Sequence, residues 1–327
     1  MPKYSVIVPV YNRPDEIAEL LESLTLQTFK DFEVLILEDN SPNKCDLVVE
    51  SFKDRLDVHY FFIPDTDRSY RRNYGMEQAK GAYFILYDSD CVIPSGYFDA
   101  VEAALRADPA DCFGGPDNAD DSFSDMQKAV NYSMTSFFTT GGIRGGARQM
   151  EKFNPRSFNM GISRKAFEVT KGFRSMIGED IDFSLRVREN GMETKLYRDA
   201  FVYHKRRVNL RRFYLQVNTF GKSRIVLTNA HPGSLKAVHT LPVFFVLGHV
   251  LLLLLALRSP LWLLFIALYA LLLFTDSWIK NKRLKIAFLS VATAYTQLFG
   301  YGIGFLDEAF TGRASRKIKD QESLYKL

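Results

Sequence analysis

Two aspartates, Asp88 and Asp90, stand one residue apart in the stretch AYFILYDSDCVIP, directly after a run of apolar residues. Two carboxylates this close repel each other unless a cation, a shared proton or open water lies between them. Carboxylate oxygens are hard ligands that suit Mg²⁺ or Mn²⁺, ions that keep part of their water and bridge substrate phosphates. An exposed pair in a turn accounts for the spacing alone equally well, so the surrounding elements must decide.

The elements around this pair alternate between strands and helices. Short apolar or β-branched runs predict strands, and apolar residues at helical spacing predict helices. The expected strands are Tyr4–Val10, Phe32–Ser41, Val58–Pro64 and Ala82–Asp90, and the expected helices lie within Tyr11–Gln27, Asp46–Lys53 and Ser69–Lys80. This order is typical of an α/β fold with a doubly wound, mostly parallel sheet, in which ligands bind at the carboxyl ends of the strands. Asp88 and Asp90 lie at such an end.

Beyond the fourth strand the pattern weakens. From Cys112 to Phe158 the sequence is polar and glycine-rich, and we interpret it as a loop without predicted elements. A further helix is expected to begin near Asp180 and to end at Gly191.

A basic segment follows. The stretch HKRRVNLRRFYLQVNTFGKSR, which begins at His204, carries seven Lys or Arg residues. Within it, Leu210, Phe213, Val217 and Phe220 fall on one helical stripe. A basic amphipathic helix of this kind suits an anionic membrane surface. A helix packed on its own domain accounts for the stripe equally well.

The last quarter of the chain is strongly apolar. Leu241–Leu257 and Leu261–Thr275 flank the interruption Arg258–Pro260, and each run is near the short end of the roughly 17 to 25 residues that span a bilayer. We therefore predict a spanning helical hairpin over residues 241–275. A buried pair of helices in a soluble domain is the alternative.

A third apolar segment covers residues 286–306 and is diluted by threonine, glutamine and glycine. The basic loop Lys280–Lys285 and the basic tail GRASRKIK should both stay in the cytoplasm, because positive charge is retained on that side. A full third crossing would misplace one of them, so the sequence favours the hairpin over a third span.

Composition limits the class of protein. The net charge of +4 is modest and the apolar residues crowd the C-terminal quarter, which favours a membrane over nucleic acid as partner. The three cysteines have no short metal-type spacing, so neither a disulfide framework nor a zinc site is expected, and a reducing compartment fits. The N-terminus lacks the features of a signal peptide, and we expect the N-terminal domain to stay in the cytoplasm.

Three segments carry a family resemblance. SVIVPVYNRPDEIAELLESLTLQTFKDFEVLILEDNS, RRNYGMEQAKGAYFILYDSD and GEDIDFSLRVRENG, in that order, resemble glycosyltransferase family 2, enzymes of the GT-A fold. The resemblance covers roughly the first 210 residues. It implies a catalytic domain over residues 1–203. The basic segment then predicts an interfacial region over residues 204–235, and the apolar segments predict a membrane region with a basic tail over residues 236–327.

The resemblance also implies roles on the donor side. Pro9, Tyr11 and Asn12 would lie beside the nucleotide, Asp39 would accept from the base, Arg72 and Asn73 would approach the nucleotide, Asp88 would contact the ribose, and Asp90 would bind Mg²⁺ or Mn²⁺. Two of these residues also fit a purely structural role. Asp39 stands in EDNSPN, which is also good turn sequence. Arg72 could equally lie on a solvated helix face.

On the acceptor side, the resemblance makes Asp180 the catalytic base, with Glu179 and Asp182 as substitutes. Aspartate is also a favoured helix N-cap, and both roles are compatible at Asp180. His204 matches a metal-binding position but could be a structural histidine. Arg144, in GGIRGG, could recognise an anionic acceptor or belong to a loop without a ligand.

These features predict an inverting, metal-dependent transfer of one sugar from a nucleotide-sugar to a lipid-linked or other glycan acceptor. The reaction would occur on the cytoplasmic face of a membrane, most simply a bacterial inner membrane, in contact with membrane lipids and without nucleic acid. Processive relatives carry a Gln-x-x-Arg-Trp motif, and QVNTFGKSR lacks the tryptophan, which disfavours a processive polysaccharide synthase. A non-catalytic membrane scaffold is the other alternative. A nicotinamide dehydrogenase is disfavoured because no G-x-G-x-x-G follows the first strand.

Overall fold

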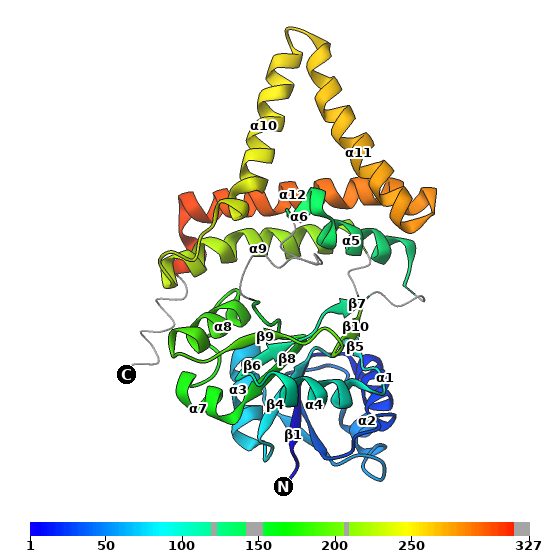
Figure 1. Ribbon diagram of the computed structural model, residues 1–327, viewed down its shortest axis with the longest axis vertical. Helices are drawn as coiled ribbons and strands as arrows, with labels where there is room; N and C mark the ends of the chain where they lie inside the picture. The colour runs from blue at the N-terminus through cyan, green and yellow to red at the C-terminus, as the bar shows by residue number, and fades with distance from the viewer. Residues whose placement is uncertain (119–122, 142–152, 206–208, 317–327) are drawn as a thin grey trace. The chain divides into compact units, whose positions relative to one another are not determined.

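The computed structural model describes residues 1–118, 123–141, 153–205 and 209–316 (Figure 1). The chain divides into two compact units. The first combines Met1–Asp120 with Lys152–Lys205, and the second combines Asp121–Glu151 with Arg206–Leu327. The domain 1–203 expected from the sequence was continuous, whereas the described residues 123–141 group with the C-terminal helices.

The first unit is built on a mixed sheet. Within the described residues its order is β3-β2-β1-β4-β8-β6-β9, and only β8 runs antiparallel to its neighbours. The strands are β1 (Tyr4–Val10), β2 (Phe32–Glu38), β3 (Val58–Phe62), β4 (Tyr83–Tyr87), β6 (Cys112–Gly114), β8 (Asn159–Ser163) and β9 (Thr194–Leu196). The parallel strands β1 to β4 agree with the prediction from sequence.

Helices cover both faces of this sheet. They are α1 (Pro14–Thr25), α2 (Asp46–Glu50), α3 (Arg68–Gln78), α4 (Tyr97–Ala107), α7 (Arg164–Thr170) and α8 (Glu179–Glu189). Val6 and Val8 of β1 join one apolar core with α1, α2 and α4, whereas Ile7 joins the other core with α3, α7 and α8. Because successive strand residues point to opposite faces, a strand buried on both faces must be apolar throughout. The valine and isoleucine residues of β1 satisfy that requirement, and the buried Ser5 hydroxyl donates to Glu33.

A second, smaller sheet lies in the same unit. Its described strands are β5 (Cys91–Val92), β7 (Asp117–Asn118) and β10 (Val202–His204), in the order β5-β10-β7. The strand β10 pairs His204 with Cys91 and Val202 with Asp117. This small sheet therefore joins segments that are about a hundred residues apart in the chain.

The second unit is helical in its described residues. Its helices are α5 (Asp125–Thr135), α6 (Phe137–Thr140), α9 (Leu210–Ala230), α10 (Leu241–Ala256), α11 (Leu263–Asn281) and α12 (Leu284–Thr311), with 3₁₀ turns η1 (Ala237–Thr240) and η2 (Pro260–Trp262). The interpretation of residues 112–158 as loop was wrong for α5 and α6, and also for β6 and β7 of the first unit. Ser124 begins α5 with a capping box, a local signal that a search for apolar periodicity misses.

The apolar stripe of α9 packs inside this unit. Phe213 and Val217 are fully or nearly buried against Val130 and Met134 of α5. Of the two roles left open by the sequence, the packing of these residues agrees with a helix that covers its own domain. Phe213 and Val217 are therefore not free to enter a lipid surface, whereas Leu210 at the start of the stripe is exposed.

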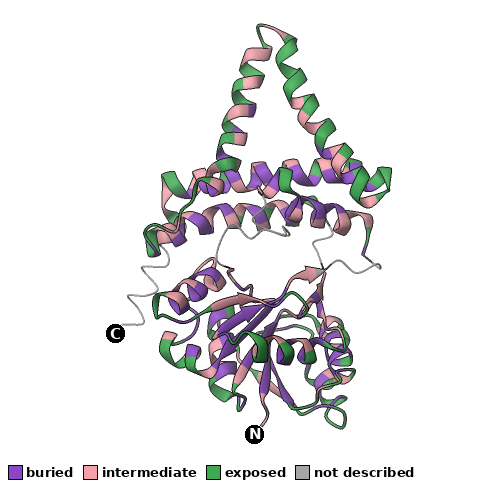
Figure 2. Cartoon of the chain, in the orientation of Figure 1, coloured by how far each residue is buried: buried purple, intermediate pink, exposed green. Residues whose placement is uncertain are grey.

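Three described helices are long and apolar enough to cross a membrane: Ala237–Ala256, Pro260–Asn281 and Leu284–Thr311. The first two contain the predicted hairpin 241–275. Figure 2 shows that α10 and α11 are largely exposed, whereas α12 carries a buried face along its length. Leu251, Leu254, Leu264 and Phe265 are each more than half exposed, which suits a lipid environment.

Candidate functional site

The carboxyl ends of β1, β2 and β4 meet at one edge of the large sheet. These strands are parallel neighbours in register, so the residues that follow each strand gather at the same edge. Tyr11 and Asn12 follow β1, Asp39 follows β2, and Asp88 follows β4. Pro9 lies within β1 itself, opposite Leu37. The structure therefore brings these predicted donor-side residues to one edge.

The turn after β1 is held in a constrained conformation. Asn12 has a φ of 53°, a left-handed value that is uncommon outside glycine. Its backbone N–H donates to Ser41 Oγ at 2.7 Å, and its side-chain oxygen accepts from Asn43 N–H at 3.2 Å. These bonds fix the turn after β1 against the turn after β2. Tyr11 is 54% exposed beside it and is available to a ligand.

Asp39 is paired with a neighbouring cation. Arg71 Nη1 lies 2.7 Å from Asp39 Oδ2, and Arg71 also donates to the carbonyl oxygen of Thr66. The Asp39 side chain is 21% exposed, so one side of the carboxylate still faces solvent. The sequence predicted a site role for Arg72 and Asn73 but not for Arg71. The three residues are consecutive, and only their directions on the helix α3 show which of them face the site.

Arg72 lies beneath the site instead of on a solvated helix face. Its side chain has no exposed surface, and it donates to Glu179 at 2.9 Å, to Asp88 at 3.3 Å and to Ser157 at 2.9 Å. A buried guanidinium must have such partners, because an unpaired buried charge is strongly unfavourable. Arg72 therefore ties the end of β4 to the start of α8.

Asn73 performs a related task. Its side-chain amide donates to the carbonyl oxygen of Phe173 at 2.9 Å and accepts from Phe173 N–H at 2.8 Å. Gly172, with a φ of 79°, lies so close that a Cβ there would clash with Asn73 Oδ1. The amide is thus committed to the turn between α7 and α8. This geometry fits a residue that positions α8 better than one that contacts a nucleotide.

Asp90 and His204 meet through the small sheet. His204 Nε2 lies 3.0 Å from Asp90 Oδ1, and His204 Nδ1 lies 3.9 Å from Asp117 Oδ2. The imidazole stacks on Phe158, with ring centroids 4.7 Å apart. The pairing of β10 with β5 and β7 produces this arrangement, since it sets His204 beside Cys91 and Val202 beside Asp117.

The acidic neighbours control the charge of this histidine. Burial lowers the pKa of His204, but the carboxylates of Asp117 and Asp90, together with the charge of nearby Asp88, outweigh burial and raise the pKa to about 9. A metal ion that binds this imidazole would therefore have to displace its proton. Burial raises the pKa of the neighbouring Cys91 thiol well above its usual value. A raised pKa disfavours the thiolate, which is the form of cysteine that binds metals, and sulfur is a soft ligand that hard cations do not favour.

Asp90 and His204 fit a divalent metal. Two ligands that bind one ion at adjacent octahedral positions, about 2.1 Å from it, have donor atoms about 3 Å apart. Asp90 Oδ1 and His204 Nε2 lie 3.0 Å apart, which is the length of a direct hydrogen bond and also places the two atoms close enough to bind one ion. A carboxylate oxygen with an imidazole nitrogen suits Mn²⁺, and Mg²⁺ is the other ion that carboxylates favour.

Asp180 lies in the first turn of α8. The helix begins at Glu179 after the N-cap Gly178, which has a φ of 84°, so Asp180 is not the N-cap. Its Oδ1 accepts from Ile181 N–H at 2.8 Å, and its Oδ2 lies 3.4 Å from Arg156 Nη1. The side chain keeps 15% of its surface exposed. The expected end of this helix at Gly191 agrees with the structure, since Gly191 has a left-handed φ of 73°.

The substitutes for Asp180 differ in their surroundings. Asp182 has no exposed side-chain surface and lies 2.8 Å from Arg186 and 3.5 Å from Arg174. A fully buried carboxylate with two ion-pair partners is poorly placed to reach an acceptor, so this geometry disfavours Asp182 as a substitute base. Glu179 is paired with Arg72, and this ion pair fixes the start of α8. Arg144 lies outside the described residues.

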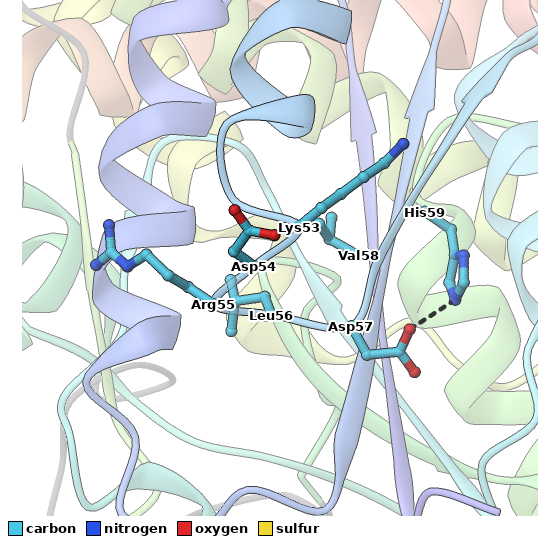
Figure 3. A pocket seen from close by; sticks show the side chains of 7 residues that line it. All are labelled: Lys53, Asp54, Arg55, Leu56, Asp57, Val58 and His59. Atoms are coloured by element: carbon cyan, nitrogen blue, oxygen red, sulfur yellow. Dashed lines mark ion pairs between the residues drawn. The ribbon is translucent and has the colours of Figure 1, made fainter.

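A second cluster that could hold a metal lies at the opposite edge of the sheet. It comprises Glu33, Asp57 and His59, near the start of β2 and β3. Figure 3 shows the adjoining surface hollow and the contact between His59 and Asp57, which is 3.1 Å long. Glu33 is already engaged by Ser5 Oγ and the N–H of Lys80. This cluster does not belong to the site formed by the strand ends.

Several residues at the site were missed from the sequence. They are Arg71, Asp117, Arg156 and Ser157. All but Arg71 come from the polar segment in which no element could be assigned. A strand of two residues such as β7 has no periodicity to detect, so the approach of Asp117 to His204 could not be foreseen.

The sequence of the chain matches that of known proteins. Residues 5–170 match the model of glycosyl transferase family 2. An uncharacterized glycosyltransferase of Rickettsia felis is 36% identical over 104 residues, which are 32% of this chain and 17% of that protein. The GalNAc(5)-diNAcBac-PP-undecaprenol beta-1,3-glucosyltransferase of Campylobacter jejuni is 32% identical over 117 residues, which are 35% of this chain and 38% of that protein. These matches therefore span less than two fifths of either relative.

The fold has a solved counterpart. A mannosyltransferase from Pyrobaculum calidifontis, solved in complex with GDP-Man and Mn²⁺, superimposes with a TM-score of 0.65 at 15% identity, over 90% of this chain and 87% of that chain. The family model covers half of the chain, and it confirms the resemblance predicted from the sequence motifs. The chain therefore belongs to glycosyl transferase family 2 and has the GT-A fold.

Proposed function

We propose that this protein transfers one sugar from a nucleotide-sugar donor to a lipid-linked or membrane-proximal saccharide, with inversion and with Mn²⁺ or Mg²⁺, on the cytoplasmic face of a membrane. One observation carries the proposal. Asp90 and His204 lie close enough together to bind one ion, and Arg72 links Asp88 to Glu179, the residue before Asp180. The buried Arg72 would thus hold a donor-side metal site and a catalytic base on α8 in a fixed relative position.

The donor would lie along the strand ends. Tyr11 and Asn12, with Asp39 and its partner Arg71, would line the nucleoside, and Asp88 would contact the ribose. Asp90 and His204 would hold the metal, which supplies positive charge to the diphosphate leaving group when bound. The Pyrobaculum mannosyltransferase, whose structure contains GDP-Man and Mn²⁺, supports this class of donor and cofactor.

Asp180 would act as the base. Its carboxylate would take the proton of the acceptor hydroxyl as that oxygen attacks the anomeric carbon, while the bond from this carbon to the diphosphate oxygen breaks. A single displacement of this kind inverts the anomeric configuration. Arg156 at 3.4 Å and Ile181 N–H at 2.8 Å would orient the carboxylate. An oriented base is effective because the reacting atoms start in a productive geometry.

The acceptor is proposed to be lipid-linked because of the apolar hairpin. The described helices α10 and α11 expose leucine and phenylalanine side chains that suit lipid. The name of the Campylobacter relative describes an undecaprenol diphosphate-linked acceptor, which supports an acceptor of the same chemical class. The basic residues within Lys280–Lys285 follow the hairpin. They support a cytoplasmic placement of that end of the hairpin.

The test uses the full-length protein in detergent or nanodiscs. UDP-, GDP- and dTDP-sugars are offered with a polyprenyl diphosphate-linked saccharide, and transfer is measured with Mn²⁺, with Mg²⁺ and with EDTA. We expect transfer of one sugar from one donor class, loss of activity in EDTA, and a product of inverted configuration. Absence of turnover with every donor would contradict the proposal, and long polymeric products would identify a processive synthase instead.

A further inference from the structure

We infer that α12 does not cross the membrane: α10 and α11 form a hairpin of two crossings, and α12 lies with α9 and α5 as a helical layer at the membrane surface. The inference rests on the membrane setting of the proposed function. It concerns the third apolar segment, residues 284–311, whose length and composition alone permit a crossing. Its surroundings in the second unit do not.

Burial separates α12 from the hairpin. In its most apolar 18-residue window, 44% of α12 is buried within the protein, against 17% for the first spanning segment and 11% for the second. Its mean hydropathy of 1.3 is also below the values of 2.2 and 1.8 for the other two. Figure 1 shows α10 and α11 rising from the same face of the helical layer, with α12 running across their bases.

The buried face of α12 is locked to α9. A Cβ at Gly221 of α9 would clash with the carbonyl oxygen of Tyr301, and a Cβ at Gly304 of α12 would clash with the carbonyl oxygen of Asn218. The two backbones therefore touch around these glycines, and Asn218 also donates from its side chain to the carbonyl oxygen of Gly300 at 3.2 Å. Any position taken by α12 in a bilayer must also be taken by α9.

The helix α9 is unsuited to the bilayer interior. It carries Arg211, Arg212, Lys222 and Arg224 within its 21 residues. Charged side chains within a hydrocarbon core are strongly unfavourable and are rare in spanning helices. If α12 crossed the membrane, α9 would carry these charges into the bilayer with it. A layer at the interface keeps them among headgroups and water.

Both ends of α12 make ion pairs with the layer. Near its first residue, Arg283 and Lys285 lie 2.9 Å and 3.0 Å from Asp125 of α5. Near its last turn, Asp307 lies 2.8 Å from Lys222 of α9. These charged contacts need a polar environment at both ends of α12. A position at the membrane surface gives both ends of α12 a polar environment on the same side of the membrane.

The charges of the hairpin agree with this arrangement. Four basic residues surround the junction of α11 with α12: Lys280, Lys282, Arg283 and Lys285. At the tip of the hairpin stands Arg258. Clustered basic residues beside a membrane bind anionic headgroups. Two crossings return the chain to the basic side. An interfacial α12 then keeps its C-terminal end, at Gly312, on that side as well.

Cysteine labelling in sealed membrane vesicles of both orientations tests this topology. The native Cys45, Cys91 and Cys112 are free and at most 1% exposed, so the wild-type protein provides a low background. Arg258→Cys, Lys282→Cys and Arg313→Cys, each at an exposed position, are treated with a membrane-impermeant maleimide. We expect Lys282→Cys and Arg313→Cys to react in the same vesicle orientation and Arg258→Cys to react in the opposite one.

Two outcomes overturn the inference. If Lys282→Cys and Arg313→Cys react from opposite sides, α12 crosses the membrane. If Arg258→Cys reacts from the same side as the other two, the hairpin does not cross. Leu257→Cys, at a position 84% exposed, repeats the measurement at the tip, and detergent-opened vesicles verify that every introduced cysteine can react. The labelling pattern does not depend on sugar transfer, so an inactive protein with the expected pattern would refute the proposed function alone.

Discussion

The residues at the edge of the sheet have unequal partners, and these partners indicate unequal roles. Asp90 faces His204 at 3.0 Å, whereas Asp88 faces the buried Arg72 at 3.3 Å. A carboxylate already paired with a guanidinium has less need of a metal ion, and one paired with an imidazole has the companion ligand that Mn²⁺ accepts. The structural contacts therefore agree with a metal role for Asp90 and a donor contact for Asp88.

The first prediction separates these two aspartates. Asp90→Asn should abolish the increase in donor affinity that Mn²⁺ produces, because the site loses its anionic ligand. Asp88→Asn should weaken donor binding but preserve the Mn²⁺-dependent increase. Titration calorimetry of nucleotide-sugar with and without Mn²⁺ measures both effects. An unchanged Mn²⁺ response in Asp90→Asn would show that another residue holds the metal.

The second prediction concerns Asp117, the acidic neighbour of His204 Nδ1. Residues that orient a metal-binding histidine typically change metal affinity by about 10- to 100-fold when they are replaced. Asp117→Asn should therefore raise the Kd for Mn²⁺, measured by electron paramagnetic resonance, by about this factor. Asp57→Asn, in the cluster at the opposite edge, is the matched control and should leave this Kd unchanged. Equal Kd values for Asp117→Asn and the wild type would refute the orienting role.

At the scale of elements, the site depends on how α8 is fixed to the sheet. Arg72 connects the end of β4 to Glu179, and Asn73 holds Phe173 in the turn before α8. The periodic apolar runs predicted the strands that end at the site, because strand burial depends on the local sequence. The apolar runs could not predict these connections, because the residues around an arginine in the sequence do not show whether its side chain is buried or exposed. The same limit applies to α5, whose partners lie in α9 and α12.

The third prediction tests the fixation of α8. Asn73→Ala removes two hydrogen bonds to Phe173 and should lower the free energy of unfolding by about 1–3 kcal/mol. It should also lower kcat more than it changes the Kd of the donor, because Asp180 moves while the strand ends stay in place. Asn190→Ala removes a hydrogen bond to Arg186 at the other end of α8 and serves as the control. A loss of donor affinity without a loss of kcat would assign Asn73 to the nucleotide instead.

At the scale of the molecule, one unit carries the sheet-edge site and the other carries the apolar hairpin. The order of the elements in the first 100 residues, the two long apolar helices of the hairpin and the family were predictable, because each depends on local patterns or on ordered motifs. The grouping of the described residues 123–141 with the second unit was not predictable. Tyr132 of α5, for example, donates to Asp276 of α11 at 2.7 Å, a contact across more than 140 residues that no local pattern indicates.

The most direct test of the proposed chemistry measures two quantities on one variant. In Asp180→Asn, transfer of sugar from the donor identified with the wild-type protein should fall by about 10²- to 10⁴-fold, the usual range for loss of a general base. The Kd of that donor in the presence of Mn²⁺ should stay unchanged, because Asp180 is proposed to contact the acceptor. Undiminished transfer by Asp180→Asn, in the presence of normal donor binding, would contradict the assignment of the base on α8.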